Sequence, residues 1–307
     1  MITRIFNKSK PINFVIVIGI IFIAFVLVNI QEFSEELSIS LLFERGGIFL
    51  ISVFSVFLLN FIVVKNRLLD QSSYHILLFG LFLAMLPITL MSVKLLLANI
   101  FILFALRRII SMRSQKNLKK KLFDASFWIG IAVFFYFWSI LFFVLIFIGL
   151  FLFSDNKLKD WIIAFTGITT VLLLSICYNL LIYNNLDTLY NIFPPFNFNL
   201  NSYNSYRLIV SITIVLTISL WATFFYINLI QSKLKIVRPL HKIIVAALII
   251  AISSLVFSDQ RTTGEFIFIF APLAIITSNY IQSIPEKWFK DAFLATLILA
   301  PIVTSFL

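Results

Sequence analysis

The sequence YHILLFGLFLAMLPITLMSVKLLLANIFILFAL, residues 74–106, holds a single Lys or Arg and no Asp or Glu. A helix needs about 20 residues to cross the hydrocarbon of a bilayer, and about 25 is the usual upper limit. The stretch is therefore apolar enough to enter a membrane but too long for one crossing. Pro87 and Lys94 lie near its middle, where the tip of a helical hairpin would fall. These features predict a helical membrane protein whose chain folds back within residues 74–106.

The composition of the whole chain predicts the same class. Hydrophobic residues make up 61% and charged residues 12% of the 307 positions, whereas a soluble domain averages about 45–50% and about 25%. A soluble core stops growing near 250–300 residues and still needs a polar surface. Residues 1–307 are therefore expected to form one all-α, polytopic integral membrane domain in contact with the lipid bilayer. Its apolar runs are 13–30, 47–64, 74–106, 126–153, 161–181, 207–230, 243–257, 266–283 and 292–307.

The distribution of positive charge predicts which loops share a side. The net charge is +11, but Lys and Arg gather in short loops, where they mark the inner side of a membrane rather than a nucleic-acid-binding surface. The basic N-terminal tail and the segments 65–67, 107–124 and 231–242 are placed inside. The amphipathic loop 31–46 is rich in Glu, and 182–206 has neither Lys nor Arg, so both are placed outside.

With these sides fixed, the runs 74–106 and 126–153 must each cross an even number of times, and both become short helical hairpins. The tip of the second falls near Tyr136–Ser139, an interfacial aromatic set. The topology then has about eleven crossings, with the N-terminus inside and the C-terminus outside. Legs this short can also be re-entrant, provided that other helices shield them or that they line a water-filled cavity. Of the 24 Lys and Arg residues, those left outside are Arg45, Lys94, Arg207 and Arg261.

Several residues exclude whole classes of site. The single cysteine, Cys177, excludes an intrachain disulfide and a cysteine-based zinc site. His75 and His241 lie at the boundaries of apolar runs and are expected at the interface rather than on a metal ion. The run 14–30 follows three basic residues as in a signal peptide, but no small-x-small cleavage site follows it, so we expect an uncleaved first crossing. No charged residue sits in the middle of a confident crossing, which counts against an ion-coupled transporter.

The inner side carries the most concentrated charge, in the segment 107–121. Polybasic loops beside membrane crossings retain topology and bind anionic lipid headgroups. We expect that partner for this segment, and no nucleic acid. Asparagines in or near the apolar runs are expected to form helix–helix hydrogen bonds. They are Asn60, Asn99, Asn179 and Asn228.

The candidate catalytic groups are the acids of the first outer loop, Glu35, Glu36 and Glu44. Carboxylates facing a substrate can act as a general base or hold a divalent metal ion. The sequence requires no cofactor, and a divalent metal ion at these acids is one option that it leaves open. A solvated loop that merely obeys the topology is the alternative interpretation.

The outer cations are the candidate ligands of a lipid phosphate. Arg261 could bind a phosphate through two parallel hydrogen bonds, helped by Arg207 or Lys94. An ion pair between Arg261 and Asp259 or Glu265 is the alternative. Either interpretation directs attention to the outer face.

Three segments carry a resemblance to a known group of proteins. They read NKSKPINF at 7–14, ALRRI at 105–109 and FDASFW at 123–128. Through them, nearly the whole chain resembles uncharacterised multi-pass inner-membrane proteins of the Bacteroidota. The resemblance implies a multi-pass protein of the bacterial inner (cytoplasmic) membrane that belongs to the cell envelope, and it brings no activity.

More distantly, the order of parts resembles the membrane core of polyprenyl-phosphate-sugar-dependent glycosyltransferases of the GT-C type. Those enzymes have an acid-bearing first outer loop, paired short helices, and a late crossing that begins with Arg and soon reaches Pro. The corresponding parts here are 31–46, 126–153, and Arg261 with FAPL at 270–273. The resemblance implies sugar transfer at the outer face. The chain departs from the pattern because it has no Asp-x-Asp pair, and Glu35-Glu36 is the nearest equivalent.

The sequence leaves three functions open and does not decide whether the protein is an enzyme. The first is a glycosyltransferase-like enzyme that uses a polyprenyl-phosphate-linked sugar. The second is a non-enzymatic scaffold or assembly subunit of a cell-envelope complex, which predicts co-purifying protein partners and tolerance of changes at the outer acids. The third is a lipid or small-solute transporter, for which the sequence offers no inverted repeat.

Overall fold

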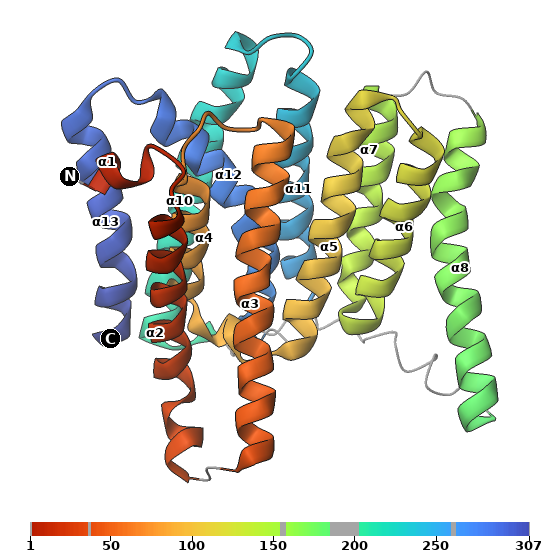
Figure 1. Cartoon of the computed structure of the whole chain (residues 1–307), viewed down its shortest axis with the longest axis horizontal. Coiled ribbons are helices and arrows are strands. Elements are labelled where there is room, and N and C mark those ends of the chain that lie inside the picture. Colours follow the sequence, from red (N-terminus) through yellow and green to blue (C-terminus); the bar gives the residue numbers. More distant parts are fainter. Residues whose placement is uncertain (1, 36–37, 154–157, 185–202, 259–261, 307) are drawn as a thin grey trace. The chain divides into compact units, whose positions relative to one another are not determined.

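The computed structural model describes residues 2–35, 38–153, 158–184, 203–258 and 262–306, and the regular elements within these residues are helices (Figure 1). Eight of them are long and apolar enough to cross a membrane, which confirms the helical membrane class. The longer helices are α2 (Pro11–Glu35), α3 (Ile39–Asn66), α5 (Val93–Ser111), α6 (Leu118–Phe135), α8 (Leu158–Tyr183), α10 (Tyr206–Ser232), α11 (Arg238–Phe257), α12 (Ile267–Ser283) and α13 (Lys287–Phe306). The shorter ones are α1 (Ile2–Phe6), α4 (Tyr74–Met85), α7 (Phe143–Phe153), η1 (Pro87–Leu90), η2 (Met112–Ser114), η3 (Phe137–Phe142) and η5 (Gly264–Phe266).

Both long apolar runs are interrupted where the sequence predicts. In the first, α4 ends at Met85 and Pro87 opens the 3-10 turn η1, because proline lacks the N–H that would continue the helix. In the second, Tyr136 is extended (φ −151°, ψ 109°) between α6 and η3, and α7 turns back to pack against α6. The two breaks are confirmed, while the count of eleven crossings and the inside and outside assignments stay predictions.

The loop between the first two long helices is shorter than the sequence predicts. The prediction that 31–46 forms an amphipathic surface loop is wrong, because α2 continues to Glu35 and α3 already begins at Ile39. Ser38 caps α3, its hydroxyl accepting a hydrogen bond from the Leu41 N–H at 3.2 Å. Glu and Leu are good helix formers, so both helices extend further into the segment 31–46 than its polar residues indicated.

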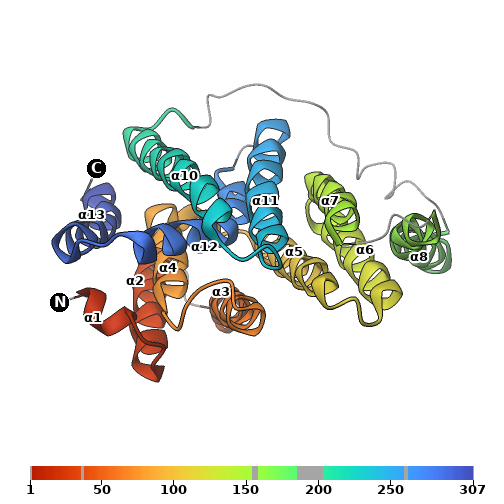
Figure 2. The same cartoon turned by 90° about the horizontal axis from the view of Figure 1, so that it is seen from above.

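One compact unit comprises Met1–Leu96, Asn199–Leu234 and Arg261–Leu307. Its centre is formed by α4 and α12, whose side chains are almost all buried. Around them stand α2, α3, α10 and α13 (Figure 2). His75 on α4 is buried, and its Nε2 lies 3.1 Å from Oδ1 of Asn60 on α3. Asn60 therefore forms the expected helix–helix hydrogen bond. The surrounding helices cover the first turn of α4, so His75 is buried in protein there, and its placement at the membrane interface stays a prediction.

The second compact unit comprises Leu97–Phe198 and Lys235–Gln260. The hairpin of α6 and α7 packs on α8 through α6 and on α11 through α7 and η3. The Tyr136 hydroxyl donates to the Ser254 carbonyl at 3.1 Å, which ties the hairpin tip to α11. Gly167 lets α8 lie close to α6, since a Cβ at this glycine would be 2.6 Å from the Phe123 carbonyl oxygen. That all of 1–307 forms a single domain stays a prediction.

Candidate functional site

The first unit contains an apolar groove of about 350 Å³. Its floor is the end of α4 and the start of η1, with Leu81, Ala84 and Pro87. One wall is α2 and the other is the C-terminal half of α13, with Pro301 near its middle. Ala24 of α2 faces the groove and narrows it less than a larger side chain would. The groove is thus a feature of four helices that are adjacent only in the folded chain.

The groove exists because α4 is short. Its 12 residues give a length of about 18 Å at 1.5 Å per residue. By contrast, α2 has 25 residues, or about 37 Å by the same rise. Where Pro87 stops α4, the neighbouring helices continue without a central helix between them. The hairpin predicted from Pro87 therefore creates the hollow.

Arg207 is the single charged residue that lines this groove. It is the second residue of α10, is partly exposed, and has no hydrogen-bond or ion-pair partner among the residues that the structure describes. Ser205 caps the helix by accepting from the Leu208 N–H at 3.3 Å. The N-terminus of a helix is the positive end of its dipole, so the field there adds to the guanidinium charge. This end of the groove therefore has a positive potential that would favour an anion.

Ser211 lies one helical turn after Arg207, on the same side of α10. Its side chain is fully buried, and its hydroxyl has no hydrogen-bond partner within the described part of the chain. Buried hydroxyls normally find a partner. The same face of α10 thus presents both a cation and an uncommitted hydroxyl.

The other predicted phosphate ligand that the structure describes, Lys94, is exposed at the start of α5. The turn η1, just before α5, packs on η5. The ring of Tyr203, four residues before Arg207, lies 6.4 Å from the Phe266 ring of η5. Lys94 and Arg207 therefore lie at the same end of the first unit, but Lys94 does not line the groove.

The predicted catalytic acids are not gathered in the groove. Glu44 is exposed on α3, one turn before Ile48, the first buried residue of that helix. Glu35 is the last residue of α2, and its side chain lies outside the described part. Glu36 and Arg261 also lie outside the described residues. Among the residues that are described, no three His, Cys, Asp or Glu side chains come together to hold a metal ion.

Sequence reasoning missed a polar network at the opposite end of the first unit. The Thr3 hydroxyl donates to Asp291 Oδ1 at 2.8 Å. Asn13 Nδ2 donates to the Ser73 hydroxyl at 3.0 Å, and Asn279 Nδ2 donates to a carbonyl of the turn after α3. The N-terminal tail, the turn before α4 and the junction of α12 with α13 thus lie together. Isolated Asn residues at the ends of apolar runs were the signal for this network.

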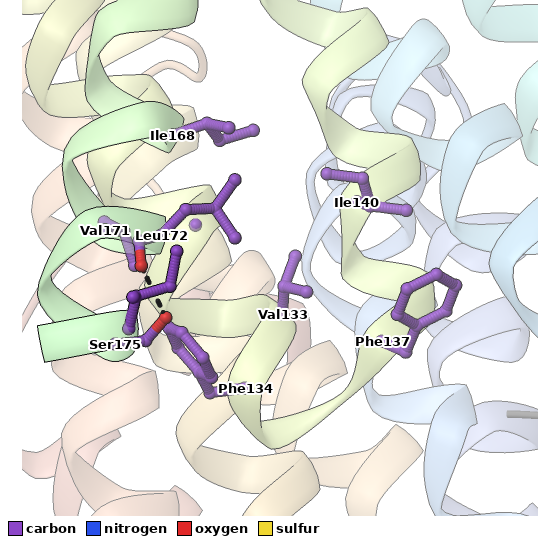
Figure 3. A pocket seen from close by; sticks show the side chains of 10 residues that line it. Val133, Phe134, Phe137, Ile140, Ile168, Val171, Leu172 and Ser175 are labelled. Carbon is purple, nitrogen blue, oxygen red and sulfur yellow. Dashed lines mark hydrogen bonds between the residues drawn. The ribbon is translucent and has the colours of Figure 1, made fainter. Parts of the chain in front are cut away.

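The second unit contains a hollow of similar size and different character. It measures about 330 Å³ and lies between α6, η3 and α8 (Figure 3). The side chains that line it are apolar except for Ser175, whose hydroxyl donates to the Leu172 carbonyl at 2.7 Å. No lining group can exchange a proton or bind an ion, so this hollow offers no acid–base chemistry.

Comparison with known proteins places the chain in a family. The chain belongs to the DUF6427 family. It is described as a family of unknown function, and the match covers residues 1–306. No curated protein and no solved structure is detectably similar to the chain. Membership of DUF6427 therefore brings no activity with it, and the groove is the feature that bears on function.

Proposed function

We propose that this membrane protein binds an anionic lipid in the groove of its first unit, with the lipid phosphate at Arg207. The observation that carries the proposal is one guanidinium, without a partner among the described residues, at the end of a groove whose other lining residues are apolar except for Ser305. A charged side chain in a membrane protein is costly unless an ion or water stabilises it, and it is functional by default. A phosphate supplies that stabilisation.

The chemistry of the groove selects an amphiphile. Contact with the apolar walls contributes binding free energy only for a hydrocarbon chain. A free anion would therefore bind through Arg207 alone. A neutral lipid would fill the space between the walls but would bring no anion to the guanidinium. A lipid with a phosphate satisfies both parts, since Arg binds phosphate oxygens through two parallel hydrogen bonds.

Polyprenyl-phosphate-linked sugars belong to this chemical class, and sugar transfer from such a lipid is the enzymatic form of the proposal. The supporting observation is the course of α2. Leu27 lines the groove, and Glu35 follows it by eight residues on the same helix, about 12 Å further along its axis. A sugar extending beyond the phosphate would point toward this acidic end, where Glu35, Glu36 or Glu44 would act as the base.

The proposed setting is the bacterial inner membrane, with the Arg207 end of the first unit outside and the basic loops in the cytoplasm. Its support is the segregation of Lys and Arg. A reporter fused after Arg113 is expected to read inside, and one fused after Ser202 outside. Two readings on the same side would overturn this topology.

The binding proposal is tested with the purified full chain in nanodiscs and a photoactivatable polyprenyl phosphate. Arg207→Gln is expected to weaken capture by about tenfold or more, because about 1.4 kcal/mol of binding free energy corresponds to a factor of ten. Arg207→Lys should keep part of the binding, since lysine retains the charge without the fork. Lys287→Gln, which removes an exposed charge from α13, is the matched control. Equal capture by all variants would refute the proposal.

The enzymatic form is tested separately. Glu35→Gln, Glu36→Gln and Glu44→Gln, made singly, should each leave lipid capture intact, and the variant that removes the base should abolish sugar transfer. Unchanged transfer in all three would exclude these acids as the base. Intact capture without transfer in the unmodified protein would leave a lipid-binding scaffold or transporter.

A further inference from the structure

The turn between α5 and α6, in the second unit, is held in a defined shape. Gln115 adopts a left-handed backbone conformation (φ 55°), and its side-chain amide donates to the Phe153 carbonyl at the end of α7. The Lys121 ammonium donates to the Ser111 carbonyl and to the Ser114 hydroxyl, each at 2.6 Å. The turn is therefore tied both to the helix before it and to the neighbouring hairpin.

These contacts divide the cations of the segment into two groups. Arg108 forms an ion pair with Asp124 of α6 at 2.8 Å, and Lys121 is engaged within the turn. The remaining exposed cations have no partner among the described residues. They are Arg113, Lys116, Lys119 and Lys120, and we call Arg113–Lys120 the basic turn.

The basic turn stands at the level of the lipid headgroups. The apolar span that contains α5 ends at Ser114, and the buried face of α6 begins at Leu122. The basic turn therefore follows directly on the end of a candidate membrane span and precedes the part of α6 that packs on the protein. Lipid phosphates are the anions that lie beside it at the highest local concentration.

We infer that the basic turn is a binding site for a phospholipid headgroup with two phosphates. Four cations fixed on one short turn repel one another, and a single phosphate would offset only part of that repulsion. A headgroup with two phosphates neutralises more of the charge than a headgroup with one. It also costs less entropy than two separate one-phosphate lipids, because only one molecule is immobilised. An unstructured polybasic loop binds according to its net charge, whereas a turn with a fixed backbone can also discriminate by the spacing of phosphates. This site is independent of the groove at Arg207.

The test uses the full chain in nanodiscs of phosphatidylcholine that contain either cardiolipin or phosphatidylglycerol at equal total charge, with bound lipid counted by native mass spectrometry. The triple variant Lys116→Gln, Lys119→Gln, Lys120→Gln is expected to lose cardiolipin binding by about fivefold for each cation removed. The control triple variant, Lys8→Gln, Lys10→Gln, Lys65→Gln, removes the same charge from the first unit. Equal loss in both triples would overturn the inference, because net charge alone would then explain binding.

A variant of unchanged charge tests the shape of the turn. Gln115→Ala removes the hydrogen bond to α7 and leaves every cation in place. We expect it to reduce the preference for cardiolipin over phosphatidylglycerol while thermal unfolding stays near that of the unmodified protein. An unchanged preference, with the turn no longer tied to α7, would also overturn the inference.

Discussion

The two hollows of this protein have nearly the same volume but different linings. The groove of the first unit, about 350 Å³, ends at Arg207, whereas the hollow of the second, about 330 Å³, has no ionisable side chain. Both lie where a helix stops early, at Pro87 in one unit and at Tyr136 in the other. A helix that ends early can therefore leave a hollow whether or not a ligand binds there.

The difference shows that charge, rather than shape, identifies the candidate site. Lipid can fill an apolar hollow in a membrane at little cost, so a hollow alone says little about function. A guanidinium that lines an apolar groove is stabilised by a nearby anion, and Arg207 is the charged residue that lines this one. This difference is the reason for proposing an anionic ligand in the groove and none in the hollow.

The largest expected effect comes from placing a charge in the uncharged hollow. Leu172→Arg, near the middle of α8, should destabilise the protein by about 2.5–3.5 kcal/mol, the cost of arginine at the centre of a membrane helix. Unfolding in lipid–detergent micelles measures it, with Leu172→Met as the control. A loss of unfolding free energy well under 1 kcal/mol would show that this hollow tolerates charge as well as the groove does. The proposed difference between the two hollows would then be refuted.

The next effect concerns the contact that forms one wall of the uncharged hollow. Gly167→Ala places a Cβ 2.6 Å from the Phe123 carbonyl oxygen, so α8 must move away from α6 at a cost of about 1–3 kcal/mol. Gly46→Ala on α3 is the matched control, because no atom lies within 4 Å of the added Cβ. Equal unfolding free energies for the two variants would argue against the close packing of α6 and α8.

A smaller effect is expected from filling each hollow with a ring. Ala84→Phe, on the floor of the groove, should weaken capture of an anionic lipid by about tenfold, equivalent to about 1.4 kcal/mol. Val133→Phe makes a comparable change in the second hollow and should leave capture unchanged. If both variants lowered capture equally, the two hollows would not differ in function.

The smallest effect is expected at Ser175, the one polar residue lining the second hollow. Its hydroxyl already bonds within its own helix, so Ser175→Ala should change the unfolding free energy by no more than about 0.5 kcal/mol. A larger loss of unfolding free energy in the same assay would show that the Ser175 hydroxyl makes a further stabilising contact in the hollow.

Much of the fold could be predicted because a bilayer imposes simple rules on a chain. The apolar runs predicted the helices, and Pro87 and Tyr136–Ser139 predicted the two breaks. Helix ends were predicted less well, since residues 31–35 and 39–46, which the sequence-based prediction assigned to a loop, are helical in α2 and α3. Hydropathy identifies apolar segments, but it does not show where the backbone hydrogen bonds of a helix end.

The candidate site could be predicted only in part. Arg207 was recognised because the predicted topology places it on the side where positive charge is disfavoured, but the sequence-based prediction assigned the leading role to Arg261, which lies outside the described residues. The sequence alone does not single out the residues that line the groove, since Ala24, Ala84 and Pro301 resemble any other residues of apolar helices. Their significance comes from facing one another across the folded chain.

The sequence by itself determined that residues 74–106 belong to a helical membrane protein and that the chain breaks near Pro87. It could do so because membrane insertion and helix interruption depend on local composition and on one missing N–H. Only the tertiary structure decided that this break lies in a groove beside α2 and α13, and that Arg207 stands at its end without a partner in the described part of the chain. Those facts depend on which distant helices pack together, and hydropathy carries no information about neighbours.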